Sequence, residues 1–489
     1  MPEAKQLQYP ELDPELKGGF NFRMLKYFGA GAIIASVTIG SGETFFASRG
    51  GAVFGYALLW CFVGGALMKG IQVYGAARYF TLTGEHPMTH WQFLPGPRGW
   101  VPAAMGFISI ACIPFWLAGL PLFLGKTITW MLGITGDDQQ LLMYGRLWGT
   151  LCIAIAVTLT WLQTYSFLEK VQVNIVGLLL FSMLAAFFAS KPDWVQALSG
   201  LVPRLPDYEP WIKENYKEIA ATPSWVEVGL YLGAIGGGTY DYIGYVGCFR
   251  EHKWGLIGQH QTDLGHHETE AIATSAQTLP IDISEENINR ARGWLWPTKI
   301  DVGIGFLCVL IFTVCFVTLG AQILRPKEVI PSGNELLTHQ AEFLTQFHPA
   351  MLYVYQIGIF TAFFGTIYGA YEIYIRTAYE CVMPLSKTFR AMQQRKFRAI
   401  VLTYCAVGGL SLLWLISDPV SIVKPAGIVG GVFTCGLWCF AMLWVDHKFL
   451  PKPLRMGPVL TSLTLISGLV LTVLGVKALW DYLEILMGG

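Results

Sequence analysis

Long apolar runs occupy most of this chain, and they restrict its fold more than any other feature of the sequence. A helix that crosses a bilayer needs about 20 mostly apolar residues, and eleven runs approach or exceed that length. The runs cover residues 26–48, 52–77, 102–132, 145–163, 166–189, 226–249, 297–323, 347–380, 397–416, 420–445 and 457–486. The sequence therefore predicts an all-α, multi-pass integral membrane protein with eleven transmembrane helices.

The composition agrees with this prediction and argues against several functions. Hydrophobic residues make up 53% of the chain and charged residues 13%, about half the charged share of a soluble domain. A formal net charge of +0 gives no reason to expect a nucleic-acid partner. The sequence contains no Walker loop, no G-x-S-x-G and no H-E-x-x-H, so we expect neither an enzyme nor an ATP-driven pump, and no cofactor. The 10 cysteines are interpreted as buried hydrophobic residues.

The distribution of Lys and Arg among the connecting segments predicts the orientation in the membrane. With the N-terminus inside, the most basic segment, residues 387–398, is cytoplasmic, as the positive-inside rule requires. Segment 190–225 then lies outside, and segment 250–295, which contains four histidines, lies inside. The inside segment includes a group that could bind a regulatory metal, although a solvated polar loop is the alternative: His260, Asp263, His266, His267, Glu268 and Glu270. We expect a plasma-membrane or inner-membrane protein with a cytoplasmic N-terminus and an extracytoplasmic C-terminus.

The first and sixth apolar runs carry glycines near their centres, each followed at once by an acid. The first reads Ile39-Gly40-Ser41-Gly42-Glu43, and the sixth reads Gly236-Gly237-Gly238-Thr239-Tyr240-Asp241. Glycine costs a helix about 1 kcal/mol relative to alanine, and an acid at the bilayer centre costs about 3 kcal/mol. We therefore expect both helices to be broken and the breaks to line a cavity. The alternative is that the glycines only permit close helix packing.

These two breaks supply the candidate substrate-binding residues. They are Gly40, Ser41, Gly42, Glu43, Gly236, Gly237, Thr239, Tyr240 and Asp241. Unwinding frees backbone carbonyls and exposes a helix N-terminus, and both can hold ions or polar groups. Glu43 and Asp241 are the candidate metal ligands, together with carbonyls near Gly40 and Gly236.

The spacing of the breaks, five spans apart, indicates two inverted five-helix repeats and one additional helix. The predicted organisation is a cytoplasmic tail (1–25), repeat 1 with helices 1–5 (26–189), an extracellular loop (190–225), repeat 2 with helices 6–10 and the cytoplasmic loop 250–295 (226–445), and helix 11 with the C-terminus (446–489).

Several segments of the chain resemble the NRAMP family of divalent-metal transporters. The stretch from Gly29 to Trp60 is similar to the first two helices of that family, and Thr83-Gly84 falls where the family has a Thr-Gly after helix 2. Gly233-Ala234 opens helix 6 in the family's manner, and Thr366-Ile367-Tyr368-Gly369-Ala370-Tyr371 looks like its T-I-x-G-x-Y. The resemblance implies the leucine-transporter-type fold and secondary active metal-ion transport, by symport and alternating access.

The residues that bind metal in the resembled family are largely replaced here. Gly40, Ser41, Gly42 and Glu43 stand in the place of D-P-G-N, and the place of A-x-x-M-P-H holds Ala234, Gly237, Gly238 and Thr239. Trp116 and Gly119 stand where the family has its helix-3 acids. With no thioether or imidazole left, an all-oxygen site would suit a hard cation such as Mg²⁺ or Mn²⁺.

Other ionisable residues within the spans are candidates for coupling or support. Glu372 and Arg376 are four residues apart and can pair on one helix face, and Lys424 is the third candidate. Lys69 and Lys126, like Lys424, are expected to extend toward the membrane surface. Lysines that faced the cavity instead would favour an anion or a zwitterion as the substrate.

Three functions remain open from the sequence. The first is an NRAMP-like transporter of a hard divalent cation. The second is a proton- or sodium-coupled carrier of a small organic solute or anion, for which the tyrosines after the sixth break would form an amphipathic lining. The third is a membrane sensor that does not transport. The expected partners are the lipid bilayer, a small ion or small-molecule substrate, and a proton or Na⁺ as coupling ion.

Overall fold

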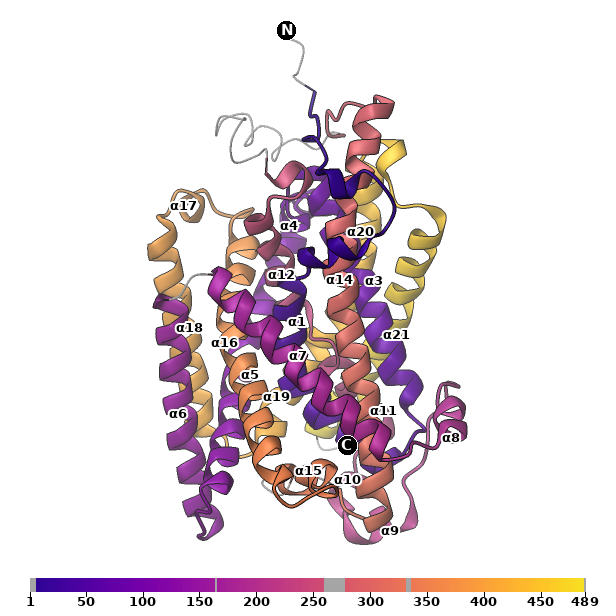
Figure 1. Cartoon of the computed structure of the whole chain (residues 1–489). Coiled ribbons are helices and arrows are strands. Elements are labelled where there is room, and N and C mark those ends of the chain that lie inside the picture. The colour runs from indigo at the N-terminus through magenta and orange to yellow at the C-terminus, as the bar shows by residue number, and fades with distance from the viewer. Residues whose placement is uncertain (1–5, 163–164, 259–277, 331–335, 488–489) are drawn as a thin grey trace.

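The structure, a computed structural model, describes residues 6–162, 165–258, 278–330 and 336–487. Its long helices run side by side, and among the described residues the one β pairing is an isolated bridge between Leu7 and Ile281 (Figure 1). The helices are η1 (Pro14–Leu16), η2 (Phe22–Tyr27), α1 (Ala30–Thr38), η3 (Ile39–Ala47), α2 (Ser48–Phe54), α3 (Leu59–Thr83), α4 (Pro87–Trp91), α5 (Trp100–Met131), α6 (Asp138–Leu162), α7 (Tyr165–Ala189), α8 (Trp194–Ser199), α9 (Pro210–Asn215), α10 (Lys217–Ala220), α11 (Ser224–Ala234), α12 (Thr239–His252), η4 (Gly255–Ile257), α14 (Glu285–Leu319), η6 (Gly320–Leu324), η7 (Arg325–Lys327), α15 (Leu336–Thr345), α16 (Met351–Val382), α17 (Lys387–Arg390), α18 (Gln394–Leu415), α19 (Pro419–Ile428), η8 (Val429–Phe433), α20 (Thr434–Phe449), η9 (Lys452–Leu454) and α21 (Pro458–Leu486).

Eight helices within the described residues are long and apolar enough to cross a membrane. They correspond to the predicted spans other than the first, second and sixth. The first run is divided among α1, η3 and α2, and the sixth is divided between α11 and α12, so neither forms one long regular helix. The second, α3, has 25 residues but includes Lys69, Gln72 and Arg78. The prediction of an all-α membrane protein is confirmed, whereas length and composition alone do not establish eleven spans.

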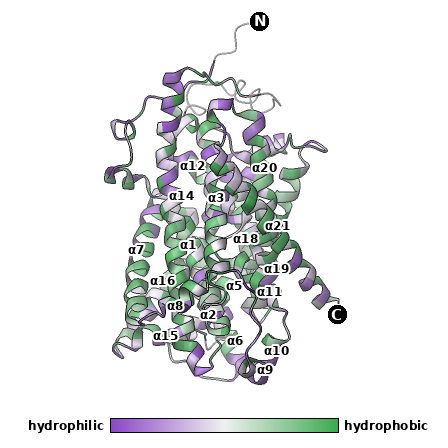
Figure 2. Ribbon diagram, turned by 90° about the vertical axis from the view of Figure 1, so that its right-hand side faces the viewer, coloured by the Kyte–Doolittle hydropathy of each residue, from purple (hydrophilic) through white to green (hydrophobic). Residues whose placement is uncertain are grey.

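The outward faces of the long helices carry large apolar side chains. Phe181 on α7 is 77% exposed and Val473 on α21 is 65% exposed. Hydrophobic residues predominate along the helices, and hydrophilic residues gather toward the two ends of the molecule (Figure 2). A soluble protein rarely exposes apolar surface on this scale, so lipid is the environment that this surface fits.

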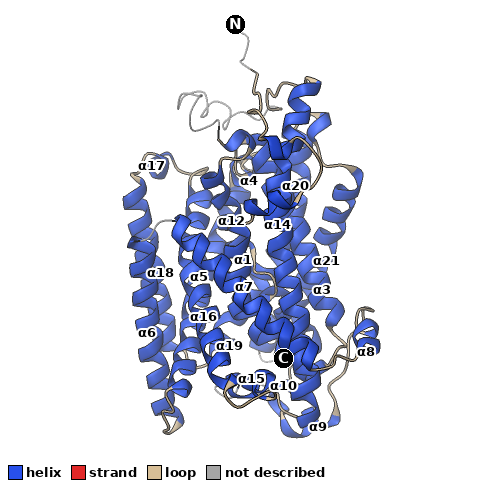
Figure 3. Cartoon of the chain, viewed as in Figure 1, coloured by secondary structure: helices blue, strands red, loops and turns tan. Residues whose placement is uncertain are grey.

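The N-terminal segment and the end of α21 lie toward opposite ends of the bundle (Figure 3). The N-terminal segment is packed against the helices: the Tyr9 hydroxyl donates to Leu82 O at 2.7 Å, and the Tyr9 amide donates to Asn287 Oδ1 at 2.7 Å. Tyr9 is 1% exposed. This part of the predicted tail is therefore attached to the ends of α3 and α14.

The two long connections, residues 190–225 and 250–295, differ in structure. Segment 190–225 contains the short helices α8, α9 and α10, and it contacts the helical bundle where Trp60 Nε1 donates to Arg204 O at 2.9 Å. In segment 250–295, the predicted group of His260, Asp263, His266, His267, Glu268 and Glu270 lies outside the described residues. The helix α14 that follows begins at Glu285, twelve residues before the apolar run.

Candidate functional site

The predicted break in the sixth span is present between α11 and α12. Residues 235–238 are not helical, and Gly236 and Gly237 have φ values of +72° and +87°. Residues with a Cβ rarely adopt such angles, so glycine at these two positions makes the turn possible. The helix dipoles of both halves thus end inside the protein, with carbonyls at the end of α11 and amides at the start of α12.

Two buried carboxylates accept the amides of this break. Glu43 Oε1, from η3, accepts from the Gly236 amide at 3.0 Å, and Asp241 Oδ2 accepts from the Gly238 amide at 2.9 Å. Glu43 is 0% exposed and Asp241 is 3% exposed. No hydrogen bond from the described residues reaches the second oxygen of either group, Glu43 Oε2 or Asp241 Oδ1. The two predicted acids therefore meet at one break, where the Tyr374 hydroxyl also interacts with the Asp241 carboxylate.

The carbonyls of the break are occupied by other side chains. Lys69 Nζ, from α3, donates to the carbonyls of Leu232, Gly233, Ile235 and Gly237. The Tyr242 hydroxyl donates to Gly236 O at 2.8 Å and to Gly237 O at 3.2 Å. Lys69 is 0% exposed, so the expectation that it extends toward the membrane surface is wrong. The reason is that backbone carbonyl oxygens at the end of α11 accept hydrogen bonds from its ammonium group.

The first span is not interrupted in the way that the sixth is. Residues 39–47 form a π-helix, η3, which widens the helix and continues directly into α2. A Cβ at Gly40 would lie 2.1 Å from Thr366 Oγ1 of α16, so this glycine permits close packing between the two helices. Ser41 and Gly42 lie within η3, and their side chains fall outside the described residues. Of the first motif, Glu43 is the residue that the structure brings to the break.

A cavity of about 10 Å³, roughly the space of one water molecule, lies between the first span and the break in the sixth. It is lined by Val37, Thr38, Trp116, Leu120, Ala234, Gly237, Tyr240, Asp241 and Tyr374. The Trp116 ring centroid is 5.9 Å from that of Tyr240, and Tyr240 is 6.4 Å from Tyr374. Trp116 thus contributes an aromatic surface to the wall of the cavity.

Thr239 is the first residue of α12, and its hydroxyl contacts neighbouring helices. Its hydroxyl is 2.8 Å from Thr434 Oγ1 and 3.1 Å from Gly430 O. These contacts join the start of α12 to η8 and α20. In this conformation Thr239 therefore positions α12, and its oxygen is used by neighbouring helices.

The predicted coupling residues lie apart from the break. Glu372 and Arg376 do form the expected i,i+4 pair at 3.2 Å, and Arg398 also binds Glu372 at 2.7 Å. Arg376 reaches Glu251 at 2.9 Å, so the pair belongs to a charged network that joins α12, α16 and α18. Lys424 is half-buried in α19, and no contact among the described residues joins it to Glu43 or Asp241.

Two further groups of buried polar contacts, which were not predicted, join the first span to its neighbours. Arg49 of α2 lies 3.7 Å from Glu227 of α11, and both side chains are buried. Toward the N-terminal end, Asp301 of α14 accepts the amides of Gly29 and Gly31, each at 2.8 Å. Asp301 also accepts from the Tyr245 hydroxyl at 2.7 Å. Sequence reasoning could have found these contacts, because Glu227 and Asp301 are acids within predicted apolar runs.

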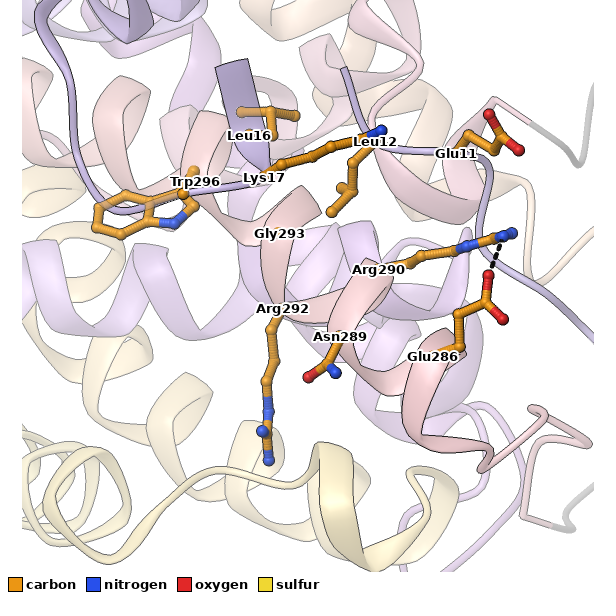
Figure 4. A pocket seen from close by; sticks show the side chains of 11 residues that line it. Glu11, Leu12, Leu16, Lys17, Glu286, Asn289, Arg290, Arg292, Gly293 and Trp296 are labelled. Carbon is orange, nitrogen blue, oxygen red and sulfur yellow. Dashed lines mark hydrogen bonds and ion pairs between the residues drawn. The ribbon is translucent and has the colours of Figure 1, made fainter. Parts of the chain in front are cut away.

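A much larger pocket, of about 630 Å³, lies away from the break, between the N-terminal segment and the first turns of α14 (Figure 4). Lys17, Arg290 and Arg292 line it, and Glu286 pairs with Arg290 at 2.5 Å. Its position outside the bundle and its charged, open rim suit the surface of the protein. The small cavity beside Asp241, between the first span and the break in the sixth, is the better candidate for a transport site.

A helical bundle with a discontinuous span and buried acids at the break is an arrangement typical of membrane transporters. The sequence model of the natural resistance-associated macrophage protein-like family, Nramp, matches residues 31–217. The resemblance to that family is thus confirmed over this stretch, which is less than half of the chain. No curated protein matches the chain significantly.

Solved structures share this fold at low sequence identity. A manganese transporter from Eremococcus coleocola, in complex with an aromatic bis-isothiourea substituted compound, has a TM-score of 0.63 and 13% identity, and the match covers 99% of this chain and 92% of that one. A mutant of the same transporter has a TM-score of 0.64 and 12% identity over 98% of this chain and 91% of that one. A nucleobase-cation-symport-1 family transporter in a closed conformation has a TM-score of 0.51 and 12% identity, over 93% and 92%. The leucine-transporter-type fold is therefore shared across the whole chain.

Proposed function

We propose that this chain is a secondary active transporter that moves a small, hard divalent cation through the break between α11 and α12. The observation that carries the proposal is the pair of buried carboxylates at that break. Glu43 accepts the Gly236 amide with one oxygen, and Asp241 accepts the Gly238 amide with one oxygen. By hydrogen-bond geometry, the second oxygen of each carboxylate has no partner among the described residues. Buried carboxylate oxygens without donors are costly unless a cation or proton joins them.

The chemistry of the available atoms favours Mg²⁺ or Mn²⁺ over softer metals. Oxygen is the donor that both free side-chain positions offer, and hard cations prefer oxygen. The described residues contain no group of three or more His, Cys, Asp and Glu that could hold a metal ion. The two carboxylates would therefore supply the charge, and backbone or hydroxyl oxygens and retained water would complete the coordination.

Alternating access would require the contacts of Asp301 and the Arg49–Glu227 pair to open in turn. If the N-terminus is cytoplasmic, as the Lys and Arg distribution predicts, Asp301 would close the cytoplasmic side and the Arg49–Glu227 pair would close the outer side. The proposal includes residues 26–189 and 226–445 as inverted repeats of five helices each, with one helix added, and a proton or Na⁺ as coupling ion. Glu372, Arg376 and Lys424 remain candidates for coupling.

A carrier of a small organic solute or anion is the second candidate. The lining of the cavity favours it, and so does the buried Lys69 ammonium, which bonds to the carbonyl of Gly237 at the cavity. Trp116, Tyr240 and Tyr374 present three aromatic rings around Asp241. Aromatic rings are common in the binding sites of organic solutes. The cavity of about 10 Å³ is too small for such a solute in the closed conformation. This candidate therefore requires the rings to separate when one side opens.

Uptake into proteoliposomes, with binding measured by calorimetry, tests both candidates. We expect Mn²⁺ or Mg²⁺ to bind and enter with the wild-type protein, and Glu43→Gln and Asp241→Asn each to weaken binding at least about tenfold, the effect of about 1.4 kcal/mol. Asp481→Asn is the matched control because Asp481 is a buried carboxylate on α21 that pairs with Lys477, away from the break. Equal uptake by Glu43→Gln, or stabilisation by organic acids or amino acids and by no metal, would count against the divalent cation.

A further inference from the structure

The ammonium group of Lys69 lies inside a set of four backbone carbonyls. Its Nζ is 2.5 Å from Leu232 O, 3.2 Å from Gly233 O, 2.7 Å from Ile235 O and 2.7 Å from Gly237 O. All four carbonyls belong to the last turn of α11 and the break that follows. The lysine reaches them from α3, more than 160 residues earlier in the chain.

The surroundings of this ammonium differ from those of an ordinary buried ion pair. Among the described residues, no carboxylate lies within ion-pair distance of Lys69 Nζ. An ammonium has three protons to donate, so four oxygens share them. The end of α11 also carries the negative end of the helix dipole, which favours a cation there. Carbonyl oxygens at these distances on several sides of one charge are the surroundings of a bound monovalent cation.

The methylene groups of Lys69 also pack beside the glycines of the break. A Cβ built at Gly236 would lie 3.7 Å from Lys69 Cδ, which is ordinary van der Waals contact, so the stem runs directly past the glycines of the break. Half-helix ends with freed carbonyls are places where transporters hold coupling cations. Here the Lys69 side chain places a positive charge at the end of α11.

We propose that the carbonyls of Leu232, Gly233, Ile235 and Gly237 form a monovalent-cation site that Lys69 occupies with its own ammonium group. The lysine excludes free cations from the end of α11, and it leaves the carboxylates of Glu43 and Asp241 as the charged ligands for a transported ion. Lys69 is thus a residue that determines specificity, a role that rests on the proposed cation transport, whereas the occupied carbonyl site itself does not.

Removing the lysine side chain should uncover this site for a small cation of similar size. We expect Lys69→Ala, in the full-length protein, to have a lower Tm than the wild type and to be stabilised by ammonium chloride in a saturable manner. Potassium chloride should act in the same direction. A ligand present at about 100 times its Kd would raise Tm by roughly several degrees in a protein of this size. N-methylglucamine chloride at equal concentration controls for ionic strength, because this cation is too large for the site.

Lys126→Ala is the matched control, because Lys126 is also a lysine within a span but its Nζ contacts a single carbonyl, Ser417 O, at 3.4 Å. For this variant and for the wild type, Tm in ammonium chloride should equal Tm in N-methylglucamine chloride. If Lys69→Ala showed no ammonium-dependent rise in Tm, or if the wild type rose equally, the proposal would be overturned.

A second variant keeps the test decisive if Lys69→Ala does not accumulate. Lys69→Ser is purified throughout in ammonium chloride or in N-methylglucamine chloride, and the yield of monodisperse protein is compared. Higher yield in ammonium chloride supports the proposal, and equal yields in the two salts contradict it. Because neither readout involves transport, a failure here is distinct from a failure of the divalent-cation proposal.

Discussion

The Arg49 guanidinium lies 3.7 Å from the Glu227 carboxylate, and this pair joins α2 of the first span to α11 of the sixth. Arg49 is 8% exposed and Glu227 is 2% exposed. In the alternating access proposed above, this pair would separate when the cavity beside Asp241 opens on that side. The interaction therefore couples the stability of the closed conformation to the movement expected of a transporter.

Breaking this pair on one side should destabilise the protein more than removing both charges. We expect Glu227→Gln to reduce the free energy of unfolding by about 3–5 kcal/mol, because it leaves a buried guanidinium without its partner. The double variant Arg49→Met with Glu227→Leu should recover most of that loss. Thermal unfolding in detergent measures both, and a double variant less stable than Glu227→Gln would contradict the expectation.

Asp301 should hold the first span closed at its N-terminal end. It accepts two amides at the start of α1 and the hydroxyl of Tyr245. We expect Asp301→Ala to cost about 2–5 kcal/mol, because two buried amides each lose an acceptor at about 1–3 kcal/mol. Asp301→Asn keeps an oxygen acceptor and should cost clearly less. Tm measured for the three proteins would test this order, and identical Tm values for the two variants would contradict it.

Close packing around the break should make Gly233 intolerant of a side chain. A Cβ at Gly233 would lie 2.2 Å from Gly427 O, a backbone atom of α19. We expect Gly233→Ala to lower stability by about 1–3 kcal/mol through overpacking. Gly303 on α14 is the control, since a Cβ there meets no atom within 4 Å. Gly303→Ala should leave Tm unchanged or raise it slightly, and a similar loss in both variants would contradict the explanation.

Glu85, in the turn between α3 and α4, should make stability depend on pH. Burial raises the pKa of its carboxyl from 4.5 to about 7, although nearby Arg250 opposes the shift. Between these values the folded protein holds a proton that the unfolded chain releases, so stability falls as pH rises from about 5 to about 7. We expect Glu85→Gln to be nearly neutral at pH 5 and to stabilise at pH 8 by up to about 3 kcal/mol.

Unfolding curves of wild type and Glu85→Gln at several pH values measure this difference. Arg250 keeps a partner in the variant, because Glu380 binds it at 2.7 and 3.0 Å. Glu286 on α14 is the control, because its side chain is 76% exposed and Glu286→Gln removes no buried charge. A gain from Glu85→Gln that is the same at pH 5 and pH 8 would exclude the titration of Glu85 as its cause.

The sequence predicted those parts of the fold that depend on local chain chemistry. The apolar runs indicated membrane helices, and the glycines at 236 and 237 indicated the break where both now have positive φ. The acids Glu43 and Asp241 were correctly expected to be unusual, since an apolar run tolerates a carboxylate only for a reason. Their roles as ligands remain predictions. The prediction was less successful for the first span, because a π-helix and a broken helix have similar glycine-rich sequences.

The partners of each charge, in contrast, were decided by tertiary structure. A bilayer-spanning helix satisfies its own backbone locally, so its presence can be predicted from about 20 successive residues. Which oxygens receive the ammonium of Lys69 depends on residues 163–168 positions further along the chain. The amide bound by Glu43 is likewise 193 positions away. These contacts exist because packing brings α3, η3 and the end of α11 together in lipid, where an unpaired charge or carbonyl has no water to bind.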